Sequence, residues 1–507
     1  MFRLCGQNGR CSVTAGTIAG LLDECAADRP QRPLLRDVEG HSLTVSDVAA
    51  LTSAAAQWLW DAGIRPGMTV AWQMPATVNA AIVMLGLARM PVVQAPVLHL
   101  YRLREVRSAV EVANADILLV DESTASDAPQ MPTVTVPPDL LARLETVTAT
   151  AHPEFDGPAP TDPRWVYFTS GTTGRPKGVR HTDATLLSAA RGYVSHLGVG
   201  SHPKELGTIA FPIAHVGGMV YLACALLGDF PVLLVPKVTA ENLPRLIAEH
   251  EVTVTGASTA FYQMLNTAQM SAPTADLLMP SLRMLIGGGA ACPPEVHRQV
   301  REHLRVPVVH AYGMTEAPMI CVSEFTDSEE QLANSAGRPI PGSEVRISAG
   351  GEIELRGENL TPGYTDREQW QHARTEDGWF RSGDRGHLRP DGRIVVTGRT
   401  KDLIIRKGEN VAPDELENEL LAHPLVDEIA VLGQPDELRG ELVCAVVRRS
   451  PRHRDVTLDE LCTFLDERGL MKQKWPERLV VVDEFPLTGL GKVAKSELAR
   501  QIAGGTS

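Results

Sequence analysis

The apolar residues in the first two thirds of the chain fall into short runs separated by amphipathic stretches. Residues 43–63 have a helical pattern that opens with Thr44 three residues before Asp47, as in a capping box, and ends at Gly63. A strand, a helix and a second strand come next, and this spacing predicts a right-handed parallel crossover. These three elements are expected at 68–74, 77–88 and 91–97.

The same alternation of apolar strands and helices continues to about residue 316. Most of the strand runs are continuously apolar, as expected of parallel strands covered on both faces. Ligands bind such sheets beyond the carboxyl ends of the strands, so the glycine-rich or polar ends near residues 169, 287 and 312 are expected to converge. Further strands are predicted at 115–123, 231–237, 252–258, 282–290 and 307–316, with a helix at 217–228.

The pattern changes near residue 340 to short alternating strands joined by turns. Asp391 and Gly392 predict a hairpin turn, and a helix is expected at 413–426. At 507 residues the chain is too long for one core, so we predict two domains. The fold class is α/β. We expect residues 1–398 to form a large N-terminal domain with mixed, largely parallel sheets covered by helices and a small β-barrel-like region, and residues 399–507 to form a small, mobile α+β C-terminal domain.

Composition limits the classes of function. Hydrophobic residues make up 43% and charged residues 22%, which is typical of a globular protein. A net charge of −14 argues against a nucleic-acid binder, although a nucleotide could still bind locally. The longest apolar runs, 80–88 and 217–228, are too short to form a transmembrane helix. The absence of a signal-peptide pattern and eight scattered cysteines without a CxxC pair predict a cytoplasmic protein with reduced thiols.

The stretch "YFTSGTTGRPKGVRHT", residues 167–182, is a candidate phosphate-binding loop. A P-loop needs its lysine directly after a glycine, but Arg175 and Pro176 precede Lys177 here, so a loop between two strands is predicted instead. Its hydroxyls and amides, with Lys177 as counter-charge, could wrap a triphosphate, and a solvated turn is the alternative. The phosphate-binding candidates are Thr169, Ser170, Gly171, Thr172, Thr173, Gly174 and Lys177.

Four later motifs accompany this stretch, and together they resemble one family. The stretch is similar to the phosphate-binding signature of the adenylate-forming enzymes, which include acyl-CoA synthetases, peptide-synthetase adenylation domains and luciferases. The other motifs follow in that family's order and approximate spacing, and the chain most resembles an acid:CoA ligase. They are "AYGMTE" (311–316), "GWFRSGD" (378–384), "GRTKDLIIRKGENVAPDELE" (398–417) and "PLTGLGK" (486–492).

The resemblance implies a reaction in two steps that uses ATP, Mg²⁺ and coenzyme A. A carboxylate attacks the α-phosphate of ATP, giving an acyl-adenylate and pyrophosphate, and the thiol of coenzyme A then takes the acyl group. Glu316 is implied as a Mg²⁺ ligand, with the Thr172 hydroxyl as a further ligand. Read alone, Glu316 would be a helix-start carboxylate and Lys492 a solvated surface charge. The implied catalytic residues are Lys492, Lys177, Thr315 and Glu316.

The resemblance also implies how the nucleotide is bound. Tyr312 would stack on adenine against the strand end that includes Gly288, and Asp384 would accept hydrogen bonds from the ribose hydroxyls. Arg399 would be the second ribose or phosphate contact. Without the family, Asp384 would be read as a turn residue. Besides the loop residues above, the implied ATP- and AMP-binding residues are Gly288, Gly289, Ala290, Ala311, Tyr312, Gly313, Thr315, Asp384, Arg399 and Lys492.

Three positions of the C-terminal domain are implied to bind coenzyme A. Gly408 resembles a glycine that lines the pantetheine tunnel, flanked by Lys407 and Glu409, and many relatives have a second glycine where Lys407 stands. Lys401 falls at the family's hinge, where the small domain is thought to rotate between the two steps. The basic run at 448–455 is either a solvated loop or a contact for the phosphates of coenzyme A.

The segment at 211–222 resembles the part of the family's fold that contacts the acyl group. Amino-acid-activating relatives have an aspartate shortly after the phenylalanine, whereas Pro212, Ile213 and Ala214 follow Phe211 here, which disfavours an amino acid. The neighbouring residues are small or apolar and favour a hydrophobic carboxylic acid. His215 is either a pocket contact or a packed core histidine. The acyl pocket is predicted to include His215, Val216, Gly217, Ala257 and Ala311.

Other functions stay open on the sequence alone. The chain could be an acyl-AMP ligase that loads a carrier protein or stops at the adenylate, or a nucleotide-binding relative without turnover. A P-loop NTPase would release ADP and phosphate rather than AMP and pyrophosphate. The expected partners are a small carboxylic acid and coenzyme A, or a carrier protein in the alternative, with no nucleic acid; a homodimer is left open.

Overall fold

The structure is a computed structural model, and its described residues form four β-sheets with helices packed on them. Those residues are 14–147, 159–169, 176–256, 258–272, 276–288, 292–406, 409–436, 440–488 and 492–504. The helices are α1 (Ile18–Asp28), α2 (Val45–Asp61), α3 (Val78–Ala88), α4 (Leu103–Ala113), α5 (Leu140–Glu145), α6 (Asp183–Leu197), α7 (Val216–Gly228), α8 (Asn242–Glu249), α9 (Thr259–Met270), α10 (Pro294–His303), α11 (Glu329–Ala333), α12 (Arg367–His372), α13 (Pro413–Leu420), α14 (Leu458–Glu467) and α15 (Lys495–Gly504). Short 3₁₀ turns are η1 (Ala125–Asp127), η2 (Thr400–Asp402) and η3 (Lys472–Lys474).

Two large sheets make up most of the molecule. In sheet A the strand order is β15 (Arg338–Pro339), β14 (Ala317–Val322), β13 (Val308–Met314), β12 (Met284–Gly288), β11 (Val254–Thr255), β9 (Gly207–Ile209), β10 (Val232–Leu234), β1 (Pro33–Arg36) and β2 (Ser42–Thr44). In sheet B it is β18 (Gly363–Tyr364), β8 (Lys177–His181), β7 (Trp165–Thr169), β4 (Val93–Val97), β3 (Thr69–Gln73), β5 (Ile117–Val120) and β6 (Thr133–Thr135).

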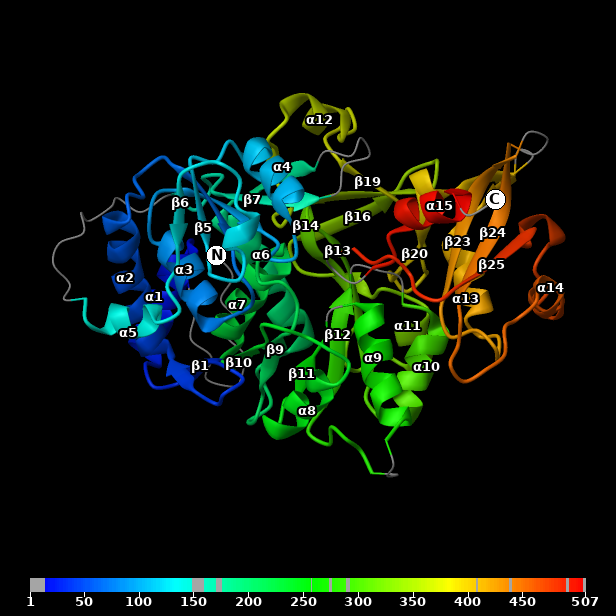
Figure 1. Cartoon of the computed structure of the whole chain (residues 1–507), viewed down its shortest axis with the longest axis horizontal. Coiled ribbons are helices and arrows are strands. Elements are labelled where there is room, and N and C mark those ends of the chain that lie inside the picture. The colour runs from blue at the N-terminus through cyan, green and yellow to red at the C-terminus, as the bar shows by residue number, and fades with distance from the viewer. Residues whose placement is uncertain are drawn as a thin grey trace.

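Two smaller sheets follow along the chain. Sheet C orders β16 (Ser343–Ile347), β17 (Glu352–Gly357), β19 (Phe380–Leu388) and β20 (Ile394–Arg399), all antiparallel. Sheet D orders β22 (Glu409–Val411), β21 (Ile404–Arg406), β24 (Gly440–Arg448) and β23 (Ile429–Asp436), with β25 (Arg478–Val482) parallel to β24. Sheet D lies at the end of the molecule opposite α1, α2 and α5 (Figure 1). The predicted fold class is confirmed: α/β with mixed, largely parallel sheets, a small β-barrel-like region, which is sheet C, and a small α+β C-terminal part.

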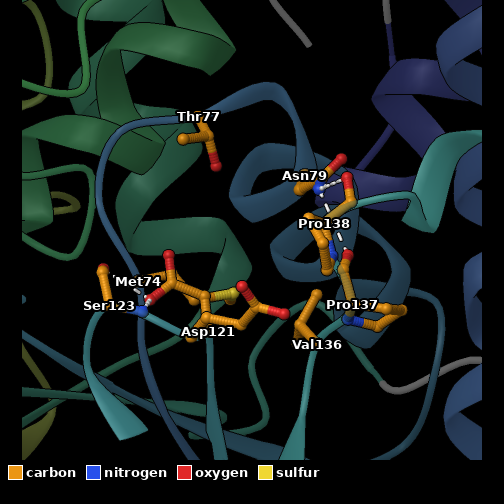
Figure 2. A pocket seen from close by; sticks show the side chains of 9 residues that line it. Met74, Thr77, Asn79, Asp121, Ser123, Val136, Pro137 and Pro138 are labelled. Atoms are coloured by element: carbon orange, nitrogen blue, oxygen red, sulfur yellow. Dashed lines mark hydrogen bonds between the residues drawn. The ribbon is translucent and has the colours of Figure 1, made fainter.

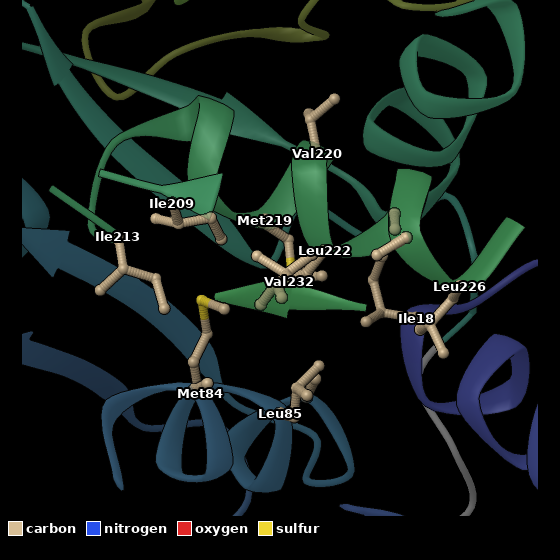
Figure 3. Close-up of a cluster of buried hydrophobic side chains, with 14 of the residues drawn as sticks. Ile18, Met84, Leu85, Ile209, Ile213, Met219, Val220, Leu222, Leu226 and Val232 are labelled. Atoms are coloured by element: carbon tan, nitrogen blue, oxygen red, sulfur yellow. The ribbon is translucent and has the colours of Figure 1, made fainter. Parts of the chain in front are cut away.

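Apolar helices fill the space between sheets A and B. Figure 3 shows side chains from α1, α3, α7, β9 and β10 meeting in one cluster. α3 and α7 are apolar on nearly every side because they are buried on nearly every side, which is why their sequence shows no amphipathic stripe. Within the described residues, no helix combines the length and apolarity needed to cross a bilayer.

Several local predictions are confirmed and two are wrong. Thr44 and Asp47 form the capping box at the start of α2, and β3 pairs in parallel with β4. The strand predicted at 252–258 is only two residues long, because the backbone at Gly256 turns to φ +149°, where a Cβ would lie 2.0 Å from a neighbouring carbonyl oxygen. The helix predicted at 413–426 ends at Leu420, since Pro424 cannot continue it.

Asp183, the first residue of α6, ties three elements of the large region together. Its side chain is fully buried and accepts hydrogen bonds from the backbone N–H of Ile18 at 3.0 Å and from the indole N–H of Trp165 at 2.7 Å. The Arg164 guanidinium lies 3.6 Å from the same carboxylate. The start of α1, the start of α6 and the start of β7 are therefore joined at one buried carboxylate.

Sheet D has its own cores on both faces. Val431 of β23 faces the cluster that includes α13 and α14, whereas its neighbours Ala430 and Leu432 face a second cluster with Leu498 of α15. Successive strand residues point to opposite faces, so α15 covers the face that α13 and α14 leave free. The predicted domain boundary at Arg399 falls on the last residue of β20, directly before η2.

Candidate functional site

The candidate phosphate loop joins two antiparallel strands. Thr169, the last residue of β7, is paired in register with Lys177, the first residue of β8, and the Lys177 ammonium lies 5.1 Å from the ring centre of Tyr364. A strand–loop–strand connection excludes a P-loop, which leads into a helix. The predicted residues between the two strands, Ser170, Gly171, Thr172, Thr173 and Gly174, lie outside the described residues.

Glu316 lies in a tight turn between the antiparallel strands β13 and β14. It is 7% exposed, and its Oε1 accepts a hydrogen bond of 2.8 Å from the Tyr364 hydroxyl. Among the described residues its Oε2 has no hydrogen-bond or ion-pair partner. The alternative of a helix-start carboxylate is wrong, because no helix begins here, and the site offers one hard oxygen to a ligand.

His181, the last residue of β8, connects that turn to sheet B. Its Nε2 lies 2.7 Å from the carbonyl oxygen of Thr315, and its Nδ1 lies 2.9 Å from the Thr185 hydroxyl. A carbonyl only accepts, so Nε2 carries the proton and the Thr185 hydroxyl donates to Nδ1. Burial lowers the pKa of His181 to about 4, against the opposing effect of the hydrogen bond to Thr315, so the ring is neutral at physiological pH.

The nucleotide candidates meet where sheets A and C approach each other. Asp384 is 6% exposed; it accepts hydrogen bonds from the Tyr312 hydroxyl at 2.8 Å and from Arg399 Nε at 2.9 Å. It lies within β19 and pairs in register with Arg399 of β20, so the alternative of a turn residue is wrong. β12 and β13 place Gly288 opposite Ala311, and a Cβ at Gly288 would lie 2.2 Å from the Ala311 carbonyl oxygen. Gly313 lies near the end of β13, and Gly289 and Ala290 lie outside the described residues.

Lys492, far along the chain, interacts electrostatically with residues of the large region. Burial lowers its pKa, the positive charge of Arg399 lowers it further, and Asp384 acts in the opposite direction. The pKa of His215 falls to about 4, mainly through burial and also through the charge of Lys492. The charges of Asp384 and Arg399 therefore act on Lys492, and the charge of Lys492 acts on His215.

Three of the candidate acyl-group residues, His215, Val216 and Gly217, lie at the start of α7. His215 is the N-cap of α7, with its Nδ1 accepting a 3.1 Å hydrogen bond from the Gly217 N–H. A Cβ at Gly218 would lie 2.1 Å from the Ile213 carbonyl oxygen, which explains the second glycine. Val216 belongs to the apolar core and Ala311 is buried in β13, while Ala257 lies outside the described residues.

The structure describes only some of the candidate coenzyme A and hinge residues. Glu409 begins β22 and Lys401 lies in η2, and Lys407 and Gly408 lie outside the described residues. Each arginine of the basic run at 448–455 is paired with a carboxylate, which favours a solvated loop over a phosphate contact. The pairs are Arg448 with Glu428, Arg449 with Asp455 and Asp483, Arg452 with Asp427, and Arg454 with Glu460.

A hollow of about 270 Å³ opens elsewhere, at the carboxyl ends of β3, β5 and β6 (Figure 2). Asn79 donates to the carbonyl oxygen of Pro138 at 3.1 Å, and Asp121 Oδ1 accepts from the Ser123 hydroxyl at 2.7 Å. Its polar groups thus largely satisfy one another. No predicted site residue among the described residues lines it. The lining consists of Met74, Thr77, Asn79, Asp121, Glu122, Ser123, Val136, Pro137 and Pro138.

Two residues at the site were missed from the sequence. His181 stood inside the stretch at 167–182, but only the fold shows that it reaches the turn before Glu316. Tyr364 follows Gly363 in a segment without a recognised motif, and nothing in the sequence indicates its hydrogen bond to Glu316. Among the described residues, no group of three or more His, Cys, Asp or Glu side chains could hold a metal by itself.

The fold and the gathered motif residues define an adenylate-forming enzyme. The chain belongs to the AMP-binding enzyme family, whose model matches residues 22–365, and the model of the AMP-binding enzyme C-terminal domain matches residues 415–492. The predicted resemblance to that superfamily is therefore confirmed.

Similar proteins are acid–CoA ligases. The sulfoacetate–CoA ligase of Cupriavidus necator is 30% identical, over 95% of this chain and 97% of that protein. The medium-chain fatty-acid–CoA ligase of Escherichia coli is 28% identical, over 96% and 90%. The crystal structure of ATP-bound MatB from Rhodopseudomonas palustris has a TM-score of 0.85 and 27% identity, covering 95% of this chain and 98% of that one.

Proposed function

We propose that this protein is an AMP-forming ligase that converts a hydrophobic carboxylic acid to its acyl-adenylate with ATP and then transfers the acyl group to coenzyme A. The observation that supports the proposal is that Lys492 interacts electrostatically with Asp384 and Arg399, which are hydrogen-bonded to each other at 2.9 Å, and with His215. An ammonium there can neutralise both the attacking carboxylate and the α-phosphate, whose mutual repulsion is the main barrier to adenylation.

The residues around Glu316 fit a magnesium ion held mostly by ATP. Mg²⁺ is often bound through one or two protein carboxylates plus substrate phosphates and water. Glu316 offers one nearly buried carboxylate oxygen without a partner among the described residues, and Lys177 lies against the same tyrosine ring. Bound there, Mg²⁺ would offset the negative charge of the phosphates.

The choice of a hydrophobic acid rests on the segment around His215. The stretch 211–222 has no acidic residue for an ammonium group and no lysine or arginine for a second anionic group. His215 is neutral near pH 7, because its pKa is about 4. A substrate with an uncharged body therefore loses least by entering, whereas a sulfonate or amino group would be desolvated without a partner.

A substrate panel tests this function. The protein would be incubated with ATP, Mg²⁺, coenzyme A and alicyclic, aromatic and medium-chain acids, with sulfoacetate and an amino acid for comparison. We expect AMP, pyrophosphate and a thioester with at least one hydrophobic acid and with neither charged compound. A Lys492→Ala variant should lose this activity, and Lys204→Ala, which removes an exposed lysine outside the site, should keep it.

Other products would refute the proposal in distinct ways. Release of ADP and phosphate would indicate an NTPase. Adenylate formation that gives a thioester only when a carrier protein replaces coenzyme A would assign the carrier-loading alternative. Absence of AMP with every acid would remove the ligase function altogether.

A further inference from the structure

The turn that bears Glu316 is held from outside by three hydrogen bonds to two consecutive residues. His181 Nε2 donates to the carbonyl oxygen of Thr315 at 2.7 Å, and the backbone N–H of Thr361 donates to the carbonyl oxygen of Glu316 at 2.7 Å. The Tyr364 hydroxyl donates to the side chain of Glu316 at 2.8 Å. All three donors come from β8 or from the segment that pairs with it, so sheet B fixes a turn that belongs to sheet A.

We propose that His181 and Tyr364 are positioning residues that hold Glu316 in the orientation needed to bind magnesium with ATP. The inference rests on the proposed function, because it assumes that the free oxygen of Glu316 is a metal ligand. His181 fixes the main chain just before the carboxylate, and Tyr364 fixes the carboxylate itself. Partners that orient a ligand in this way commonly change metal affinity 10- to 100-fold when they are removed.

Tyr364 can act as a rigid donor because its ring is packed on several sides. It is 5% exposed and pairs in register with Val179 of β8. The ring of Trp370 meets it edge-on at 5.6 Å between centroids, and Phe380 stacks behind Trp370 at 5.7 Å. A phenol fixed in this way leaves its hydroxyl little freedom, so Glu316 Oε1 is occupied in one rotamer and Oε2 is left for the ion.

The same ring also lies beside the candidate phosphate lysine. The Lys177 ammonium is 5.1 Å from the ring centre, within the range of a cation–π contact. Tyr364 thus contacts the carboxylate through its hydroxyl and the ammonium through its face. Losing only the hydroxyl should disturb the carboxylate and leave the lysine contact, which makes Tyr364→Phe the informative change.

His181 acts through the backbone and depends on a single tautomer. Thr185 donates to Nδ1, which leaves the proton on Nε2 pointing at the Thr315 carbonyl. Without that donor, the partly buried carbonyl of Thr315 would lose its partner and the turn would be free to shift. His181→Asn, which is too short to reach the carbonyl from the same backbone position, tests this arm.

The experiment measures binding of ATP by calorimetry over a series of Mg²⁺ concentrations, without acid or coenzyme A and therefore without turnover. For Tyr364→Phe we expect the Mg²⁺ concentration at half-maximal ATP binding to rise 10- to 100-fold, with metal-free ATP binding unchanged. Glu316→Gln should show the larger loss, and adding Tyr364→Phe to it should have no further effect.

Tyr167→Phe is the matched control. Tyr167 also pairs in register with Val179, is 2% exposed, and its hydroxyl has no hydrogen-bond partner among the described residues. Removing this phenol should leave the Mg²⁺ dependence unchanged. If the loss of any buried hydroxyl from sheet B had this effect, the Mg²⁺ dependence of ATP binding would shift in both variants.

The outcomes separate this inference from the proposed function. An unshifted Mg²⁺ dependence in folded Tyr364→Phe and His181→Asn would overturn the inference, as would ATP binding by the unaltered protein that does not respond to Mg²⁺. A strong Mg²⁺ response in a protein that makes no AMP from any acid would refute the ligase function and leave the role of Tyr364 intact. Melting temperatures would identify a variant that fails to fold.

Discussion

The two charged groups expected to act on ATP are held in opposite ways. Glu316 lies between sheets A and B, and residues more than 40 positions away along the chain bond to it and to its neighbour. Lys492 is instead tied to its own neighbourhood, where Thr488 and Lys492 bond through the backbone at 2.7 Å. The carboxylate is therefore held in place by the large region, whereas Lys492, which we expect to be delivered to the nucleotide, belongs to a part of the chain with separate cores.

That difference indicates which steps of the reaction Glu316 and Lys492 can each control. A fixed carboxylate is ready before the nucleotide arrives, so it suits binding of Mg²⁺ and ATP. A lysine on a separately folded part can be withdrawn after adenylation, so it suits a step that must stop once the adenylate has formed. The variants below test this contrast.

Removing the delivered charge should have the largest effect. Lys492→Ala should reduce acyl-adenylate formation about 10²- to 10³-fold, the usual cost of losing one charge-stabilising group in a transition state. Binding of ATP should change little, because the lysine is not part of the fixed half. Pyrophosphate release and calorimetry measure the two quantities, and equal losses in both would mean that Lys492 only supports binding or folding.

A change in the fixed half should affect binding first. Asp384→Asn keeps the shape but weakens the bonds that Asp384 accepts from Tyr312 and Arg399 and would make to a ribose. We expect nucleotide affinity to fall about 10- to 100-fold, as for a lost charged hydrogen-bond acceptor, with a smaller loss in kcat. A change in kcat alone would contradict the assignment of Asp384 to binding.

The packing of the C-terminal part, which bears Lys492, can be weakened without changing Lys492 itself. Lys495 lies 2.7 Å from Glu417 and 3.8 Å from Asp414, joining the start of α15 to α13. Lys495→Met should destabilise the C-terminal part by about 1–3 kcal/mol, since it leaves two half-buried carboxylates without their cation. Calorimetric unfolding measures this, with Lys474→Met, which breaks the more exposed pair with Glu415, as the control. Equal effects of the two variants would deny Lys495 a special role.

The junction between the two halves should show a dependence on pH. His215 has a pKa of about 4 in the folded protein and an ordinary value of 6.5, so between these values the unfolded chain binds more protons and stability falls as the pH is lowered. His215→Asn keeps an N-cap for α7 and removes the titration. On acidification from pH 7 to 4, the free energy of unfolding of the variant should fall by about 1–2 kcal/mol less than that of the unaltered protein, allowing for the partly exposed ring. If the stability of both proteins falls equally with pH, His215 does not contribute to the pH dependence.

The smallest effect is expected at the basic run of the C-terminal part. Arg448 and Arg449 are already paired with carboxylates, so replacing both with alanine should change the KM for coenzyme A by less than about twofold. A large, salt-sensitive rise in that KM would instead support a contact between these arginines and the phosphates of coenzyme A.

Much of the fold was predictable because its signals are local. The capping box at Thr44, the continuous apolar strands β3 and β12, and the turn at Asp391 and Gly392 each follow from a few adjacent residues. The length of β11 was not predictable, because it depends on a backbone approach at Gly256 from a strand 30 residues away.

The site was predictable only where a motif carried it. Glu316, Asp384 and Lys492 were proposed through the family resemblance, since each alone reads as an ordinary surface or turn residue. Tyr364 and His181 could not be found, because their partners come from another sheet and no spacing along the sequence encodes that contact. The acyl pocket has the same difficulty, as its depth depends on side chains from segments that are distant in sequence.

The buried carboxylate of Asp183 bears on how the chain could be dissected. The family match begins at residue 22, inside α1, yet the backbone N–H that bonds Asp183 belongs to Ile18. A chain shortened to the matched span would remove that donor and the first turn of α1, and would expose one side of a buried charge that also holds Trp165 and Arg164. A fragment that keeps this buried contact must therefore start at or before Ile18, ahead of the span that the family model matches.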